Sequence, residues 1–119
     1  MVVMRTKTNE FSGTVESLGF FGNIYARHLA FAKAGDTMHG HSHNFNHVTL
    51  VSHGAITVWR RDQEDRTYTA PAFIEIPSEV THEFTAMVDN TECWCIFAVR
   101  NLDGEVIDRF EDPSKVTGF

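Results

Sequence analysis

Long apolar runs and cysteine are both scarce in this sequence. No stretch of about 18 apolar residues occurs, which excludes a transmembrane helix. The N-terminal residues lack a charged stretch followed by an apolar run and a small-residue cleavage site, so we expect no secretory signal. The two cysteines, Cys93 and Cys95, are one residue apart and would point the same way in a strand, which disfavours a disulfide between them. We therefore expect reduced thiols and a cytoplasmic protein.

Positive charge is also in short supply. The chain has 10 Lys and Arg against 16 Asp and Glu, a formal net charge of −6. The pair Arg60-Arg61 is the largest basic group, whereas phosphate contacts need clustered Lys and Arg. This balance argues against nucleic-acid binding as the main task. The acidic residues are scattered and indicate a solvated surface.

The remaining composition is that of an ordinary globular protein. Apolar residues make up 42% and charged residues 22% of the 119 positions. This length suits a single domain over residues 1–119 and is sufficient for a real hydrophobic core.

Turn signals divide the chain from residue 23 onward into short segments typical of β-strands. The turns are indicated by Gly35-Asp36, by the polar residues 61–66 and by Asp89-Asn90. The first twenty or so residues are weakly patterned, and we predict no helix there. The expected strands are residues 23–34, 47–52, 55–60, 67–70, 73–76, 83–88 and 93–99. This pattern predicts an all-β sandwich or barrel with a core of about 23–100, an N-terminal arm and a C-terminal tail.

Four of the seven histidines, His41, His43, His47 and His82, have a spacing that suits a metal site. Residues two apart in a strand share a face, so His41 and His43 can both point inward. His47 has the same parity and follows one short bend later, and a barrel would bring His82 across from a distant strand. For a single histidine, packing or hydrogen bonding is the simpler explanation. For four together we favour a metal, because neutral imidazole binds Mn, Fe, Ni, Cu and Zn.

Two segments around these histidines resemble the cupin family. Residues 35–54, from Gly35 through the three closely spaced histidines to Gly54, resemble its first motif. Residues 77–86, from Pro77 through His82, resemble its second motif. The resemblance implies a cupin-type jelly-roll barrel, or double-stranded β-helix, with one metal ion inside, and often a homodimer.

The chain departs from the cupin pattern at two positions. Glu79 replaces the usual glycine of the second motif, and His47 stands where cupins usually carry glutamate. The second change is similar to small single-domain cupins with four histidine ligands, some of which resemble manganese-binding proteins and oxidative enzymes. Mn or Fe is therefore the first expectation for the divalent ion, with Ni, Cu or Zn as alternatives.

Four neutral imidazoles would leave the full +2 charge on the ion. We expect such a site to attract anionic ligands and to favour the lower oxidation state. On an octahedral ion two coordination positions would remain open, which is compatible with catalysis. Structural zinc is less suitable, because it prefers closed tetrahedral sites that usually contain cysteine.

Several other residues are candidates for the pocket. Tyr25 and Arg27 share one face of an early strand; they would bind an anionic substrate if that face is interior and would lie on the surface if it is not. His39 is a residue that hydrogen-bonds to a ligand, a spare ligand, or a surface histidine at a turn. In small four-histidine cupins the last strand often reads Phe-Leu-Cys, which implies that Cys95 faces the metal; the alternative is an inert buried thiol.

Aromatic residues supply a second set of candidates. Phe45, Phe84 and Phe73 would line an apolar pocket or belong to the plain core. Glu75 and Glu83 are each one residue away from inward positions and are expected to face outward, which weakens both as general bases. His28 is most simply a strand histidine. His53 is expected at a strand end, where it could contact a partner subunit.

Three functions follow from these residues. The first is a metal-dependent oxygenase of the dioxygenase type that acts on a small, anionic organic substrate. The second is a lyase or isomerase that uses the metal without O₂, with Tyr25 as its acid or base. The third is a metal- or ligand-binding module without turnover. None of the three involves a nucleic acid or a membrane.

Overall fold

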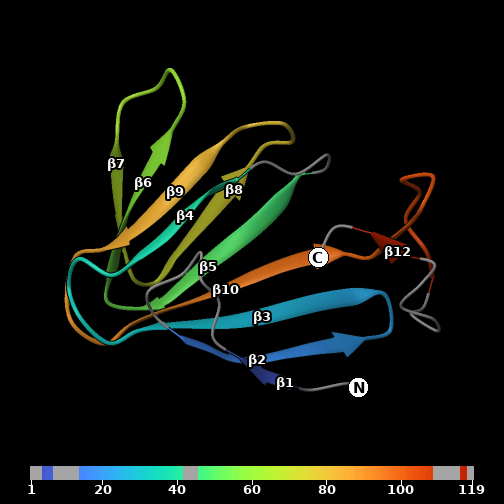
Figure 1. The fold of residues 1–119 in the computed structure, drawn as a ribbon, viewed down its shortest axis with the longest axis horizontal. Helices are drawn as coiled ribbons and strands as arrows, with labels where there is room; N and C mark the ends of the chain where they lie inside the picture. Colours follow the sequence, from blue (N-terminus) through green and yellow to red (C-terminus); the bar gives the residue numbers. More distant parts are fainter. Residues whose placement is uncertain (1–3, 7–13, 42–45, 109–115, 118–119) are drawn as a thin grey trace.

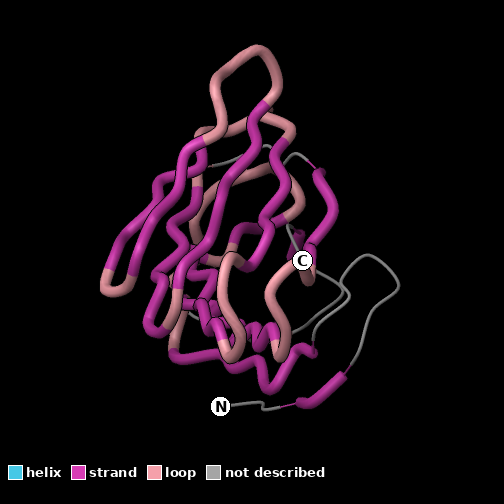
Figure 2. Tube along the Cα trace, turned by 90° about the vertical axis from the view of Figure 1, so that its left-hand side faces the viewer, coloured by secondary structure: helices cyan, strands magenta, loops and turns pink. Residues whose placement is uncertain are grey.

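The computed structural model describes residues 4–6, 14–41, 46–108 and 116–117, with side chains described for residues 19–38 and 46–108. These residues form strands and loops only (Figure 2). No helix among them is long and apolar enough to cross a membrane.

The larger sheet has six antiparallel strands that come from distant parts of the chain (Figure 1). In spatial order they are β1 (Met4–Thr6), β2 (Thr14–Phe21), β3 (Ile24–Phe31), β10 (Thr91–Ala98), β5 (His47–His53) and β8 (Ala72–Ile76).

The second sheet has four antiparallel strands, and a short ribbon lies apart from both sheets. The second sheet has the order β4 (Thr37–His41), β9 (His82–Ala86), β6 (Ala55–Arg60) and β7 (Arg66–Thr69), and the ribbon pairs β11 (Arg100–Asn101) with β12 (Val116–Thr117).

The inner faces of the two sheets pack on one another. Alternation along β10 places Cys93 and Cys95 inside, and alternation along β9 does the same for Phe84 and Ala86. The shared core contains Leu29, Phe31, Met38, Val51, Ile56, Val58, Ile74, Ile76, Phe84, Ala86, Cys93 and Cys95. The predicted all-β jelly-roll architecture is therefore confirmed, since two antiparallel sheets enclose this apolar core.

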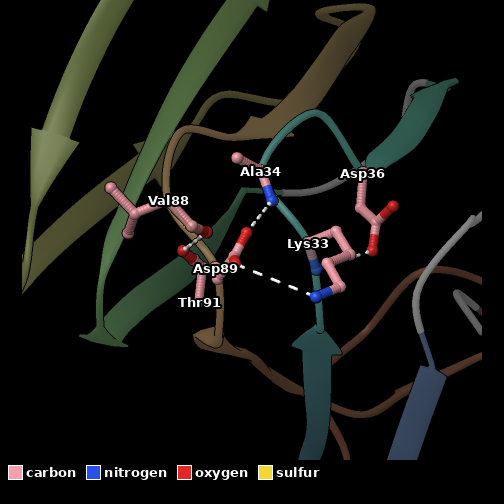
Figure 3. Close-up of polar contacts among 6 residues, drawn as sticks. All are labelled: Lys33, Ala34, Asp36, Val88, Asp89 and Thr91. Atoms are coloured by element: carbon pink, nitrogen blue, oxygen red, sulfur yellow. Dashed lines mark hydrogen bonds and ion pairs between the residues drawn. The ribbon is translucent and has the colours of Figure 1, made fainter.

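One end of the barrel is closed by hydrogen bonds between turns. Gly35 N donates to Ala86 O at 2.7 Å, and Ala86 N donates to Asp36 O at 2.9 Å. The Asp89 carboxylate accepts from Ala34 N at 2.9 Å and lies 3.9 Å from Lys33 Nζ (Figure 3). These contacts fix the β3–β4 turn against the β9–β10 turn.

Gly54, between β5 and β6, belongs to the same closed end. Its φ is +80°, and a Cβ built there would lie 2.9 Å from Thr91 Cα. Both the left-handed backbone and the close approach require glycine. Its place in the first motif therefore has a structural reason.

Most of the strands expected beyond residue 23 are observed within one or two residues of their predicted ends. The sequence did not predict β1, β2 or β4, nor the two-residue strands β11 and β12. Gly19 lies inside β2, and Gly22, at φ +65°, turns β2 into β3. The weak pattern before residue 23 therefore contains a hairpin strand, which tertiary pairing stabilises in place of local propensity.

Candidate metal centre

The end of the barrel opposite the Asp89 turn gathers the histidines of both motifs. β4 ends at His41 and β9 begins at His82, and these two residues are direct Cα partners in the antiparallel pair β4–β9. β5 begins at His47 in the facing sheet, in register with Ile76 of β8. The strand ends therefore bring three predicted ligand positions to the same end of the interior.

The side chains of His47 and His82 meet inside the barrel. Their exposed fractions are 7% and 1%, and their ring centroids lie 5.5 Å apart with an interplanar angle of 49°. Nδ1 of His47 and Nε2 of His82 are both shielded from solvent. Two buried imidazoles from opposite sheets therefore lie side by side without stacking.

A backbone contact sets the tautomer of His82. Its Nδ1 lies 3.0 Å from the carbonyl oxygen of Val80. A carbonyl can only accept, so Nδ1 carries the proton and Nε2 of the neutral ring keeps its lone pair. Metal-binding histidines usually have their second nitrogen held in this way. In its neutral form, His82 therefore offers Nε2 as the nitrogen for a metal ion.

The pair fits a shared divalent ion. Two imidazoles bound to one ion through bonds of about 2.0–2.1 Å have ring centroids about 4.5–6 Å apart. The 5.5 Å between His47 and His82 lies in this range. The side chain of His41 and all of His43 lie outside the described residues. No group of three metal-ligating side chains occurs among the side chains that are described, so the four-histidine set stays a prediction.

The inner face of the larger sheet lies beside His47. In register, Tyr25 lies opposite Phe97, and Arg27 opposite Cys95, which in turn faces Thr49 of β5. Tyr25 is buried at 6% exposure. The face that carries Tyr25 and Arg27 is therefore interior, which resolves the alternative that the sequence left open.

Cys95 is a buried thiol two residues along the sheet from the His47 row. Its Sγ and Thr49 Oγ1 share a hydrogen bond at 3.6 Å. Burial raises the pKa of Cys95, and the Thr49 hydrogen bond and Arg27 partly oppose this effect. The thiolate is the form that binds metals. A protonated Cys95 therefore suits a pocket wall better than a ligand, and both cysteines are free as predicted.

Tyr25 lies between two phenylalanine rings. Its ring centroid is 4.6 Å from Phe97 and 5.4 Å from Phe20. Burial raises the pKa of Tyr25, Arg27 lowers it, and Cys95 raises it further. The phenol therefore stays protonated at neutral pH and can donate a proton or a hydrogen bond.

The sequence reasoning missed one polar group on the second sheet. Arg60 is the β6 partner of His82 in register, and its Nη2 donates to the hydroxyl of Tyr68 at 3.2 Å. Tyr68 packs against the shared core, and the guanidinium of Arg66 lies 5.2 Å from its ring centroid. The alternation of Ile56, Val58 and Arg60 along β6 was the available signal.

Comparison of the fold with solved structures gives consistent matches. A cupin family protein with a double-stranded β-helix from Methanocaldococcus jannaschii matches with a TM-score of 0.66 at 20% identity, over 82% of this chain and 89% of that chain. KdgF from Halomonas sp. matches with a TM-score of 0.65 at 17% identity, over 84% of this chain and 91% of that chain. The fold is that of a cupin.

A third match is a variant of oxalate decarboxylase from Bacillus subtilis. Its TM-score is 0.68 at 14% identity, over 81% of this chain and 27% of that chain, so this chain spans little more than a quarter of the enzyme's length. No protein-family profile and no curated protein sequence matches this chain. The likeness to cupins therefore concerns the fold.

The aromatic candidates for the pocket lie in different places in the cupin barrel. Phe84 is fully buried, belongs to the core and lies 5.4 Å from the His82 ring between centroids. Phe73 is 73% exposed, so it does not belong to the core; it lines a pocket together with His47 and Glu75. Ile74 and Ile76 take the inward positions of β8, which turns Phe73 and Glu75 outward. Phe45 lies outside the described residues.

The remaining polar candidates also have definite places. Glu83 is partly buried between two inward neighbours on β9, and Glu75 is exposed, so both face outward as expected. The register of β4 shifts between Met38 and His41. This bulge interrupts the alternation that grouped His39 with the ligands, and the side chain of His39 is not among those described.

Two histidines have outer-surface contacts instead. His28 stacks on Trp94 with centroids 4.3 Å apart, and its Nε2 lies 3.2 Å from Glu92 Oε1. His53 is the last residue of β5, and its Nδ1 donates to Asn90 O at 2.7 Å. Neither belongs to the histidine end of the barrel, in agreement with their expected roles as strand residues.

Proposed function

We propose that this protein is a metal-dependent oxygenase that acts on a small organic substrate. The divalent ion, Mn or Fe, would be held by His41, His43, His47 and His82. One observation supports this most: the buried rings of His47 and His82 lie 5.5 Å apart, from opposite sheets of a cupin barrel. When bound, such an ion supplies open coordination positions and redox chemistry toward O₂.

The residues of the chain have separate tasks in this proposal. The Val80 carbonyl holds the Nδ1 proton of His82 and so keeps Nε2 directed to the ion. Phe84 and the protonated Cys95 exclude water from the interior beside it. Tyr25 offers a hydroxyl proton from an apolar surrounding. A dry site of this kind protects reactive species from water.

A lyase or isomerase that needs no O₂ is the second candidate. It is favoured by Tyr25, because a buried, protonated phenol can act as a general acid. One of the fold matches is an oxalate decarboxylase, which makes a non-oxidative reaction on a small acid a reasonable alternative. Both candidates use the same histidines and differ in the metal and in O₂.

Metal identity and O₂ consumption separate the two candidates. The purified protein should contain about one Mn or Fe per chain and consume O₂ with a substrate from a panel of small organic acids and phenols. His82→Ala should lose both properties. A Zn- or Ni-containing protein that turns over a substrate without O₂ would instead support the lyase or isomerase. Metal binding without turnover of any compound would support a binding module.

A further inference from the structure

Arg27 places a positive charge on the inner face of the larger sheet. It lies opposite Cys95, and Cys95 lies opposite Thr49, two residues along β5 from His47. Tyr25 and Leu29, two residues before and after Arg27 on β3, are both buried, so Arg27 lies on the inward face of this strand. The guanidinium therefore faces the same space as the histidines.

No carboxylate neutralises this guanidinium within the described part of the chain. Ion pairs in that part of the chain include His28 with Glu92 and Lys33 with Asp89. Among the side chains of residues 19–38 and 46–108, the buried polar residues are two histidines and two threonines, and none is acidic. Acidic residues are nevertheless abundant, since the net charge is −6. A partly buried cation without a counter-charge is unfavourable unless an anion binds it.

We propose that Arg27 binds the carboxylate of a small organic acid, which occupies the interior between the guanidinium and the histidine end. The proposal rests on the proposed function in one respect, because the acid would be the substrate of the metal site. It names the substrate class: a small carboxylic acid with its charged group toward β3 and its remaining atoms toward His47 and His82.

The chemistry of the surroundings favours a carboxylate. Arginine presents a planar fork of N–H donors that matches the two oxygens of a carboxylate. The neighbouring groups are an uncharged phenol, thiol and hydroxyl, from Tyr25, Cys95 and Thr49. β10 alone separates β3 from β5, so two strand spacings of about 4.8 Å each lie between Arg27 and Thr49.

Calorimetric titration of the purified protein at fixed ionic strength tests the proposal. The probes are malonate and benzoate, each paired with its neutral amide, malonamide or benzamide. The variants are Arg27→Gln, Arg27→Lys and, as a matched loss of one surface charge, Arg61→Gln, since Arg61 is exposed in the β6–β7 turn. Metal content and thermal unfolding are measured on every sample.

We expect at least one acid to bind the wild type and its amide to bind much more weakly. Arg27→Gln should weaken acid binding about 10- to 100-fold, because a charged hydrogen-bond pair is lost. The affinity of Arg27→Lys for the acid should lie between those of the wild type and Arg27→Gln, because lysine cannot form the two-pronged contact. Arg61→Gln should bind like the wild type.

Binding of neither acid, equal binding of acids and amides, or unchanged affinity in Arg27→Gln would overturn the proposal. If Arg27→Gln does not fold, Arg27→Lys decides, with reduced affinity supporting the proposal and unchanged affinity opposing it. Metal content judges the proposed function separately. A metal-free protein that still binds an acid through Arg27 would refute the oxygenase and leave the carboxylate site standing.

Discussion

The two ends of this cupin barrel are built from different contacts. At the closed end, the main-chain groups of Gly35 and Ala86 bond to one another's turns, and Asp89 accepts from Ala34 N. At the histidine end, the buried groups are the imidazoles of His47 and His82. Hydrogen-bonded turns stabilise a fold, whereas buried imidazoles contribute little to packing and much to ligand binding.

This contrast assigns the stability of the fold to the closed end and the binding of metal and ligand to the histidine end. Variants at the closed end should change the free energy of unfolding and leave metal binding intact. Variants at the histidine end should change metal and ligand binding first. The predictions below test this division, from the largest expected effect to the smallest.

Acidification should release the metal ion from the histidines. Imidazole must be neutral to bind a metal and has an ordinary pKa of about 6.5. We expect affinity for Mn²⁺, measured by chelator competition, to fall at least about 100-fold between pH values of about 7.5 and about 5.5. Asp89→Asn, at the closed end, should show the same fall. An affinity that stays constant over this range would contradict histidine ligation.

Gly54→Ala should damage the closed end. The new Cβ would press on Thr91 Cα at 2.9 Å, and alanine disfavours φ +80°. The overlap and the left-handed backbone together should lower the free energy of unfolding by about 2–4 kcal/mol in urea denaturation.

Gly104→Ala is the matched control for Gly54→Ala. Its φ is +83°, and nothing lies within 4 Å of a Cβ built there. It should cost only the backbone part, about 1–2 kcal/mol. Equal losses in the two variants would show that the contact of Gly54 with Thr91 is unimportant, and loss of metal from folded Gly54→Ala would contradict the separation of the two ends.

Glu79→Gly should stabilise the turn that leads into His82. Glu79 has φ +64°, a left-handed conformation that is unfavourable for a residue with a Cβ. Relief of this strain outweighs the added freedom of the unfolded chain, so we expect a gain of about 0.5–1 kcal/mol in thermal or urea unfolding. Ser78→Gly, one residue earlier, should destabilise. A loss of stability in Glu79→Gly would refute the strain.

The two cysteines should differ in reactivity along β10. Burial raises the pKa of Cys93 well above its usual value and raises that of Cys95 with partial opposition from Thr49 and Arg27. Both thiols should react with iodoacetamide more slowly than in the unfolded chain, because less thiolate is present. Mass spectrometry should find Cys95, nearer the histidine end, modified before Cys93. The reverse order would contradict the greater exposure of Cys95, which is 8% against 0% for Cys93.

The sequence predicted most of the fold because its strands after residue 23 alternate clearly and end at turn residues. Asp89-Asn90 is an example: Asn90 has φ +56°, a conformation that asparagine tolerates. β2 was missed because Gly19 and polar residues weaken its pattern, and its register comes from pairing with β3. Local patterns cannot show such tertiary pairing.

The site was predicted in part for related reasons. Motif spacing identified His47 and His82, which the structure brings together. Phe73 lies outside the core on the same face of β8 as Glu75, and the parity of this strand was the available signal. Arg60 was considered only as part of a basic pair, and its place beside His82 depends on the β6–β9 register. The register between two distant strands cannot be predicted from the sequence of either strand alone.

Elemental analysis of four matched samples tests the central claim most directly. They are the wild type, His47→Ala, His82→Ala and His53→Ala, the last being a histidine at the opposite end of β5 that hydrogen-bonds to Asn90 O. We predict about one Mn or Fe per chain in the wild type and in His53→Ala, and loss of the metal from the other two. Retention of the metal in folded His47→Ala or His82→Ala, or a wild type that binds none after reconstitution, would contradict the account.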